Sequence, residues 1–186
     1  NEHLLPVELS AGSITSCLAN RPGDPIPGIY TFGTIGTAVE LVFVPQFNWF
    51  MPKLPANAVE LTLPAGTTAI ASALNSSGVT NLFVSGSAGL SVFVPGNQGQ
   101  GAVPVVVVTN ALAMGASQLA ASTNGGQTAV WGVNAQGGLF YVQCAEGSEG
   151  EATAWSAPVP LLPSVEGFAF YLNLNAGSNV LFANID

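Results

Sequence analysis

Aromatic residues recur in this chain at a nearly constant spacing of about 50 residues, and this periodicity constrains the fold more than any other feature. Each marks the centre of a short β-like run, and successive members are 51, 48 and 51 residues apart: Phe32, Phe83, Trp131 and Phe182. The tetrapeptide Val-Phe-Val-Pro occurs at 42–45 and again at 92–95, and Leu139-Phe-Tyr-Val142 takes the corresponding place in the third copy. A fixed period of this length is the sequence signature of a repeat architecture.

Each repeat contains short β-like runs separated by turns rich in Gly, Asn, Ser and Pro, as expected for antiparallel strands. We predict inner strands at 14–19, 68–74, 117–122 and 167–172, and second strands around the four aromatic residues. Third strands are predicted at 39–44, 90–94 and 139–143, and outer strands at 6–9, 58–63, 105–108 and 158–162. Four antiparallel strands per unit of this length indicate a β-propeller-like blade.

The order of the runs predicts one all-β domain of about four propeller-like units, the last of them incomplete: 12–63, 64–109, 113–163 and 164–186. Val7-Glu-Leu9 matches the outer-strand run Val59-Glu-Leu61, so residues 1–11 are expected to complete the last unit. The N- and C-terminal strands would then close a small ring of about four blades by pairing. The alternative is that the chain is a piece of a larger ring of about five to seven blades. Because the apolar runs lack the alternation of a half-exposed strand, neighbouring sheets are expected to bury both faces of each blade.

The composition excludes several classes of partner. Of 186 residues, 48% are hydrophobic and 6% are charged, and Arg21 and Lys53 stand against ten acidic residues, for a net charge of −8. Nucleic acids and anionic membrane surfaces both require a footprint rich in Lys and Arg, so we expect neither partner. The apolar runs are too short for a membrane-spanning helix. The low charge and the start at Asn1, without a methionine, favour a processed, secreted protein.

The best-defined unit reads Gln127-Thr-Ala-Val-Trp-Gly-Val-Asn-Ala-Gln-Gly-Gly-Leu-Phe-Tyr-Val-Gln143, and Trp155-Ser-Ala-Pro-Val-Pro-Leu-Leu162 follows an acidic loop. This pattern, best over residues 127–173, resembles a blade of the tectonin or tachylectin-like β-propeller lectin family. The unit at 30–44 lacks the Asn-x-x-Gly turn of that family, and the unit at 81–94 lacks the tryptophan of the outer strand. The resemblance implies a lectin or pattern-recognition protein that binds glycans between or on top of its blades.

Sugar binding needs aromatic faces for the apolar side of a pyranose ring and amides for its hydroxyl groups. Six residues of the third unit supply these groups: Trp131, Asn134, Phe140, Tyr141, Gln143 and Trp155. We predict that they converge at a blade junction and hold a glycan. For Trp131, for Trp155 and for one of Phe140 and Tyr141, the alternative is a place in the core between blades, because buried aromatic residues dominate protein cores.

Patterns for nucleophilic catalysis and for metal binding are scarce. The single histidine, His3, lies beside the first residue of the chain, and a Ser-His-Asp triad would depend on it entirely. Cys17 and Cys144 are far apart in sequence and are expected to be free, buried thiols, which leaves no Cys/His zinc cluster. We therefore predict no metal and no cofactor.

The carboxylates allow two further interpretations. A pair among Glu8, Glu40, Glu60 and Glu166 would suit glycoside hydrolysis, but Glu8 and Glu60 occupy matching repeat positions, which favours a solvent-facing role. The loop that carries Glu146, Glu149 and Glu151 is expected to be solvated, with a calcium site as the alternative.

We predict a non-catalytic, lectin-like protein that holds glycans by aromatic stacking and amide hydrogen bonds. The alternative is an extracellular structural or assembly subunit, in which weakly charged surfaces contact other chains. In that case the apolar loop Phe47-Asn-Trp-Phe-Met51 is a candidate contact, and a second copy or a second chain completes the ring. A glycoside-processing enzyme is the third hypothesis.

Overall fold

The structure is a computed structural model, and it describes residues 4–5, 8–14, 19–20, 27–35, 37–45, 54–55, 59–78, 80–93, 105–173 and 178–184. These residues form β-strands and two short 3-10 helices, η3 (Ala111–Ala113) and η4 (Ala152–Ala154). None of the described residues lies in an α-helix, and no helix among them is long and apolar enough to cross a membrane. The all-β prediction is confirmed for this part of the chain.

Four antiparallel sheets follow one another in chain order. Sheet I has the order β2-β4-β5-β7, with β3 also beside β4: β2 (Glu8–Ile14), β3 (Ala19–Asn20), β4 (Pro27–Ile35), β5 (Ala38–Pro45) and β7 (Val59–Leu63). Sheet II has the order β8-β9-β10-β11: β8 (Ala69–Leu74), β9 (Thr80–Gly86), β10 (Gly89–Phe93) and β11 (Val105–Val108).

Sheet III repeats the order of sheet II, with β12 (Gln118–Asn124), β13 (Gln127–Val133), β14 (Leu139–Ala145) and β15 (Val159–Leu162). Sheet IV pairs β16 (Gly167–Asn173) with β17 (Ser178–Asn184). A separate short pair joins β1 (Leu4–Leu5) to β6 (Leu54–Pro55). In sheets II and III each strand therefore pairs with the next one along the chain, which confirms the predicted strand order within these two units.

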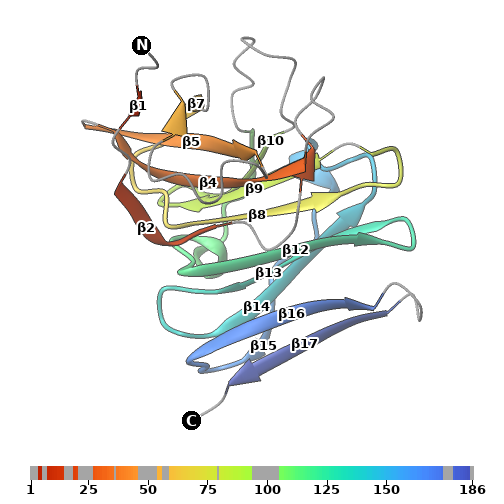
Figure 1. Cartoon of the computed structure of the whole chain (residues 1–186). Coiled ribbons are helices and arrows are strands. Elements are labelled where there is room, and N and C mark those ends of the chain that lie inside the picture. Colours follow the sequence, from red (N-terminus) through yellow and green to blue (C-terminus); the bar gives the residue numbers. More distant parts are fainter. Residues whose placement is uncertain are drawn as a thin grey trace.

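The sheets lie face to face, as Figure 1 shows from sheet I in orange to sheet IV in blue. One apolar cluster fills the layer between sheets I and II and includes Phe32, Phe43 and Leu82. A second fills the layer between sheets II and III and includes Phe83 and Phe140. Sheet II is thus buried on both faces, which explains its nearly continuous apolar strands. Burial of each large side chain contributes about 1.5–3 kcal/mol.

Successive residues of one strand enter opposite layers. On β9, Leu82 and Val84 pack into the layer toward sheet I, and Phe83 between them packs toward sheet III. This alternation follows from the two-residue period of a β-strand. Neighbouring residues of one strand therefore pack against different neighbouring sheets, and every second residue packs against the same one.

The strand register shows that the two Val-Phe-Val-Pro tetrapeptides, which the repeat treats as equivalent, are offset by one residue. Phe32 lies opposite Leu41, and Phe83 lies opposite Val92, so the true step between these third strands is 51 residues and not the 50 of the Val-Phe-Val-Pro match. A slip of one residue moves a side chain to the other face of its sheet. Phe43 of sheet I therefore faces sheet II, and Phe93 of sheet II faces sheet I. Both side chains belong to the same apolar cluster.

The N-terminal strand also differs from the prediction. Glu8 and Leu9 belong to β2 and pair with Thr34 and Gly33 of β4, so they do not form an outer strand of the last unit. Part of the predicted inner strand, 15–18, lies outside the described residues. The edge of β4 presents backbone donors and acceptors that need partners, and β2 and β3 supply them together. Glu8 and Glu60 are consequently not equivalent, since β7 pairs with β5.

The predicted closure of the ring is not shown. Among the described residues, sheet IV consists of β16 and β17 alone, and the N-terminal strand that was expected to complete it lies in sheet I. The division of the chain into four units of one domain stays a prediction.

Candidate functional site

One face of sheet III is turned toward sheet IV. Val133 and Leu139 on this face form a small apolar cluster with Val165, which the side chains of Leu162 and Ala183 border. Ala183 belongs to β17, so the cluster joins the two sheets at one end of their junction. Residues two positions away along a strand share its face, and the side chains that follow along this face are Trp131, Tyr141 and Gln143.

Trp131 and Tyr141 face each other across β13 and β14. Each is the register partner of the other, so the two aromatic side chains stand next to each other on the same face. Ala120 of β12 flanks the pair on one side and Val159 of β15 on the other. Both aromatic side chains are half-buried, and each therefore keeps part of its surface accessible.

Gln143 lies on the same face, opposite Ala129, and is also half-buried. Its backbone is held by Ser156, whose hydroxyl accepts from the Gln143 N–H at 3.1 Å and whose N–H donates to the Gln143 carbonyl at 2.8 Å. Within the described part of the chain, no hydrogen bond engages the Gln143 amide or the Tyr141 hydroxyl. A ligand at this face would therefore meet two polar groups that are free to bind it.

The equivalent position in sheet II is closed. There the row runs Ala71, Phe83, Val92 and Val105, and Phe83 is completely buried. Sheet III covers Ala71, Phe83 and Val92 of this row. Trp155 stands edge-on to Phe83 with 5.9 Å between ring centroids. In sheet III, by contrast, the corresponding residues Trp131 and Tyr141 are only half-buried, so this open face of sheet III is less completely covered than the matching face of sheet II.

Asn134 serves a turn. Its side-chain oxygen accepts from the backbone N–H groups of Gln136 at 2.9 Å and of Gly138 at 2.8 Å. These bonds shape the connection between β13 and β14 in the manner of an Asx turn. The turn also reaches the next unit, because the Val165 N–H donates to the Gly137 carbonyl. Asn134 is thus largely buried, and its side-chain oxygen is used within the turn.

Phe140 and Trp155 do not lie on the face that carries Trp131. Phe140 is 0% exposed and Trp155 is 8% exposed, and both lie in the cluster between sheets II and III. Phe140 follows Leu139 and precedes Tyr141, so the strand alternation places it on the opposite face. The Trp155 indole N–H donates to the Glu149 carbonyl at 2.9 Å. The core alternative holds for these two residues, and the predicted set reduces to Trp131, Tyr141 and Gln143.

The acidic loop after β14 is tied to the protein by hydrogen bonds. The Ser76 hydroxyl and backbone N–H each donate to one Glu146 oxygen at 2.6 Å, across the junction of sheets II and III. These two bonds lower the pKa of Glu146. Glu149 is buried, and its carboxylate accepts from the Thr128 hydroxyl at 2.7 Å and from the Gly147 N–H at 2.9 Å.

Cys144 lies in the same junction as a buried free thiol, as predicted. Burial raises the pKa of this thiol to about 12, and the negative charge of Glu149 adds to the rise. The thiolate is the reactive form of cysteine, so Cys144 is unreactive at neutral pH. His3, Cys17 and the apolar loop 47–51 lie outside the described residues.

Other candidate groups do not assemble into a site. Across the described ranges, no three His, Cys, Asp or Glu side chains are grouped so that they could hold a metal ion. The Thr62 hydroxyl donates to Glu40 at 3.0 Å in sheet I, and the Asn184 amide donates to Glu166 at 2.7 Å beside sheet IV. The side chains of Glu8 and Glu60 are outside the described set.

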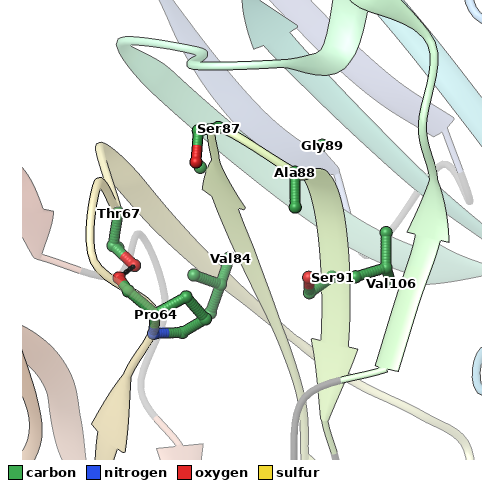
Figure 2. A pocket seen from close by; sticks show the side chains of 9 residues that line it. Pro64, Thr67, Val84, Ser87, Ala88, Gly89, Ser91 and Val106 are labelled. Carbon is green, nitrogen blue, oxygen red and sulfur yellow. Dashed lines mark hydrogen bonds between the residues drawn. The ribbon is translucent and has the colours of Figure 1, made fainter.

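A small cleft that the sequence did not predict lies beside the turn between β9 and β10 (Figure 2). It has a volume of about 70 Å³, and its walls include Pro64, Thr67, Val84, Ser87, Ser91 and Val106. Ser91, Val84 and Val106 form one row across sheet II. The sequence signal for it is the serine in Leu90-Ser91-Val92, a polar residue within an apolar strand.

Comparisons with known proteins add little to this geometry. No protein-family model and no curated protein matches the chain, so the resemblance to tectonin blades stays a prediction. One similar solved structure is a fucose-specific lectin from Aleuria aurantia, in a mercury-derivative form, with 14% identity and a TM-score of 0.48. The likeness covers 89% of this chain and 55% of that chain, so the chain spans about half the length of the lectin. At this TM-score the likeness carries no argument about ligand or mechanism.

Proposed function

We propose that this protein binds neutral glycans, without catalysis, on the open face formed by Trp131, Tyr141 and Gln143. The observation that carries the proposal is a contrast in burial: Phe83 is completely buried in sheet II, whereas Trp131 at the matching position of sheet III is only half-buried. An accessible indole beside a phenol offers a flat apolar surface for a sugar ring. The Tyr141 hydroxyl and the Gln143 amide supply donors and acceptors for its hydroxyl groups.

The charge distribution supports a neutral ligand. Both basic residues of the chain, Arg21 and Lys53, precede sheet II, so residues 54–186 contain no Lys or Arg. A sulfated or sialylated glycan would meet no cation here, and the net charge of −8 would repel it. We further propose that the stacked sheets are blades of a propeller-like ring and that the protein acts outside the cell.

The test measures affinity for the neutral glycan that binds best on an array, by titration calorimetry with the wild type and four variants. Trp131→Ala is expected to weaken binding about tenfold or more, or about 1.4 kcal/mol. Tyr141→Phe and Gln143→Ala each remove a polar group and should cost about 0.5–1.5 kcal/mol. Gln127→Ala, an exposed residue on the same strand, is the matched control and should leave affinity unchanged. Equal affinity in all five proteins would refute the proposal.

An assembly role is the second candidate, and the outer strands favour it. Four large apolar side chains are exposed there: Val105, Val106, Val159 and Leu161. Exposed apolar side chains that gather in one region mark surfaces for other proteins. Light scattering across a range of concentrations separates the two functions. A stable oligomer without glycan binding, which Val105→Lys with Val159→Lys dissolves, would favour assembly over recognition.

A further inference from the structure

The cleft beside the β9–β10 turn is lined by a hydroxyl group to which the protein itself makes no hydrogen bond. Ser91 is 6% exposed and lines the cleft. In the described part of the chain, no hydrogen bond engages its hydroxyl, and this oxygen is not among the fully buried polar atoms, so it is reachable from the cleft. Water can therefore satisfy this hydroxyl, and a group that displaces the water must itself bond to Ser91 or leave it unpaired at a cost of about 1–3 kcal/mol.

The walls around Ser91 are apolar and uncharged. Pro64 and Val84 lie on one side of Ser91 and Val106 on the other, and Ser87 lies at the turn (Figure 2). The Thr67 hydroxyl donates to the Pro64 carbonyl at 2.8 Å, so toward a ligand it acts as an acceptor. Val106 is 37% exposed, which leaves an apolar surface that extends from the cleft toward solvent.

The size and polarity of the cleft restrict the group that fits. A volume of about 70 Å³ is several times the ~10–15 Å³ of such space that one water needs, so a group of a few heavy atoms fits, such as one carbon and one oxygen. A methyl group would fill the cleft but leave Ser91 without a partner. A carboxylate would enter a site whose walls carry no cation. A primary alcohol satisfies both requirements, because its oxygen bonds to Ser91 and its carbon contacts the apolar walls.

We propose that this cleft binds the exocyclic hydroxymethyl group of a neutral hexose, at a second sugar subsite separate from the Trp131 face. The sugar class rests on the proposed function, but the subsite uses none of its residues. The hydroxymethyl group enters between Pro64 and Val106 and exchanges a hydrogen bond with Ser91. Sites that hydrogen-bond a substrate hydroxyl discriminate strongly against the analogue that lacks it, so the cleft selects hexoses over their 6-deoxy counterparts.

The experiment is a titration of the full chain with D-galactose and D-glucose, followed by amide NMR, with the two 6-deoxy sugars as controls. We expect the amides of Ser87 through Ser91 to shift with at least one of the hexoses at millimolar concentration, and that sugar's 6-deoxy counterpart to bind at least about tenfold more weakly. Ser91→Ala should abolish this difference without lowering the melting temperature, since it removes an unpartnered hydroxyl. Unshifted amides with both hexoses, or equal shifts with the 6-deoxy sugars, would overturn the proposal.

Trp131→Ala separates this inference from the proposed function. The variant should lose glycan binding at the face between sheets III and IV and keep the shifts of Ser87 through Ser91. If those shifts disappear together with Trp131, the cleft is not an independent subsite and the inference fails. If the shifts persist and Trp131→Ala binds glycans as the wild type does, the proposed function fails and the cleft stands.

Discussion

The Trp155 indole meets the Phe83 ring edge-on across the junction of sheets II and III, with 5.9 Å between their centroids and 77° between their planes. Aromatic pairs favour this arrangement, in which the positive edge of one ring faces the negative face of the other. The pair joins a residue of the second strand of one sheet to the loop between the third and outer strands of the next. It therefore holds neighbouring repeats together.

Trp155→Ala is expected to lower the free energy of unfolding by about 3–5 kcal/mol, because it leaves a cavity beside Phe83. Trp155→Phe keeps an aromatic ring there but removes the hydrogen bond to the Glu149 carbonyl, and should cost about 1–3 kcal/mol. Urea denaturation followed by circular dichroism measures both losses. If Trp155→Ala and Trp155→Phe were as stable as the wild type, the junction would not depend on this contact.

Gly89 and Gly125 offer a matched test of the sheet geometry. Both have positive φ angles, of 117° and 60°. A Cβ atom at Gly89 would collide with the Val108 carbonyl oxygen, whereas nothing lies within 4 Å of one at Gly125. Gly125→Ala should lower the free energy of unfolding by about 1 kcal/mol, because alanine adopts a positive φ less readily than glycine. Gly89→Ala should cost clearly more, as thermal denaturation would show; equal losses would argue against the close approach of β10 to the end of β11.

The contact between Ser76 and Glu146 predicts a pH dependence of stability. The pKa of Glu146 in the folded protein is lower than its ordinary value of 4.5, so the carboxylate stabilises the fold above that pH. This stabilisation is lost as the pH falls through the folded-state pKa. Glu146→Gln cannot titrate, and its stability should fall less than that of the wild type over the same range. Parallel urea titrations at neutral and acidic pH compare the two proteins, and identical pH profiles would contradict the prediction.

Glycan charge provides another prediction. Neutral glycans should bind with an affinity that hardly changes with salt, because stacking and neutral hydrogen bonds are not screened. Sulfated and sialylated glycans should bind more weakly at low salt and recover in part as salt screens the repulsion. Array binding at two salt concentrations measures the difference. Preferential binding of acidic glycans at low salt would show that the charge argument is wrong.

Much of the architecture could be predicted from the spacing of Phe32, Phe83 and Trp131, because one supersecondary unit repeated along a chain leaves one period in its sequence. The face that each side chain takes could not be predicted from the tetrapeptide match. Phe43 and Phe93 look equivalent, yet a one-residue difference in register places them on opposite faces of their sheets. The strand that pairs with Glu8 could not be predicted either. Val7-Glu-Leu9 and Val59-Glu-Leu61 match in sequence, but Glu8 lies in a strand that pairs with β4 and Glu60 in one that pairs with β5.

Strand register also explains why the candidate site was predicted only in part. Trp131 and Tyr141 come together because they are register partners, whereas Phe140 is excluded by strand parity. The two-residue period of a strand is enough to separate Phe140 from Tyr141, since adjacent residues point to opposite faces. Trp155 and Asn134 could not be assigned that way, because both lie outside strands and their roles depend on contacts with Glu149 and Gly138.

The indole N–H signals of Trp131 and Trp155 test the central claim most directly. In a nitrogen-15 NMR titration with a neutral glycan, the Trp131 signal should shift, because this side chain lies on the open face of sheet III. The Trp155 signal should stay in place, because its N–H is buried and bonded to Glu149. Trp131→Ala and Trp155→Phe assign the two signals. A Trp131 signal that does not move at saturating glycan, or a shift confined to Trp155, would contradict glycan recognition at this face.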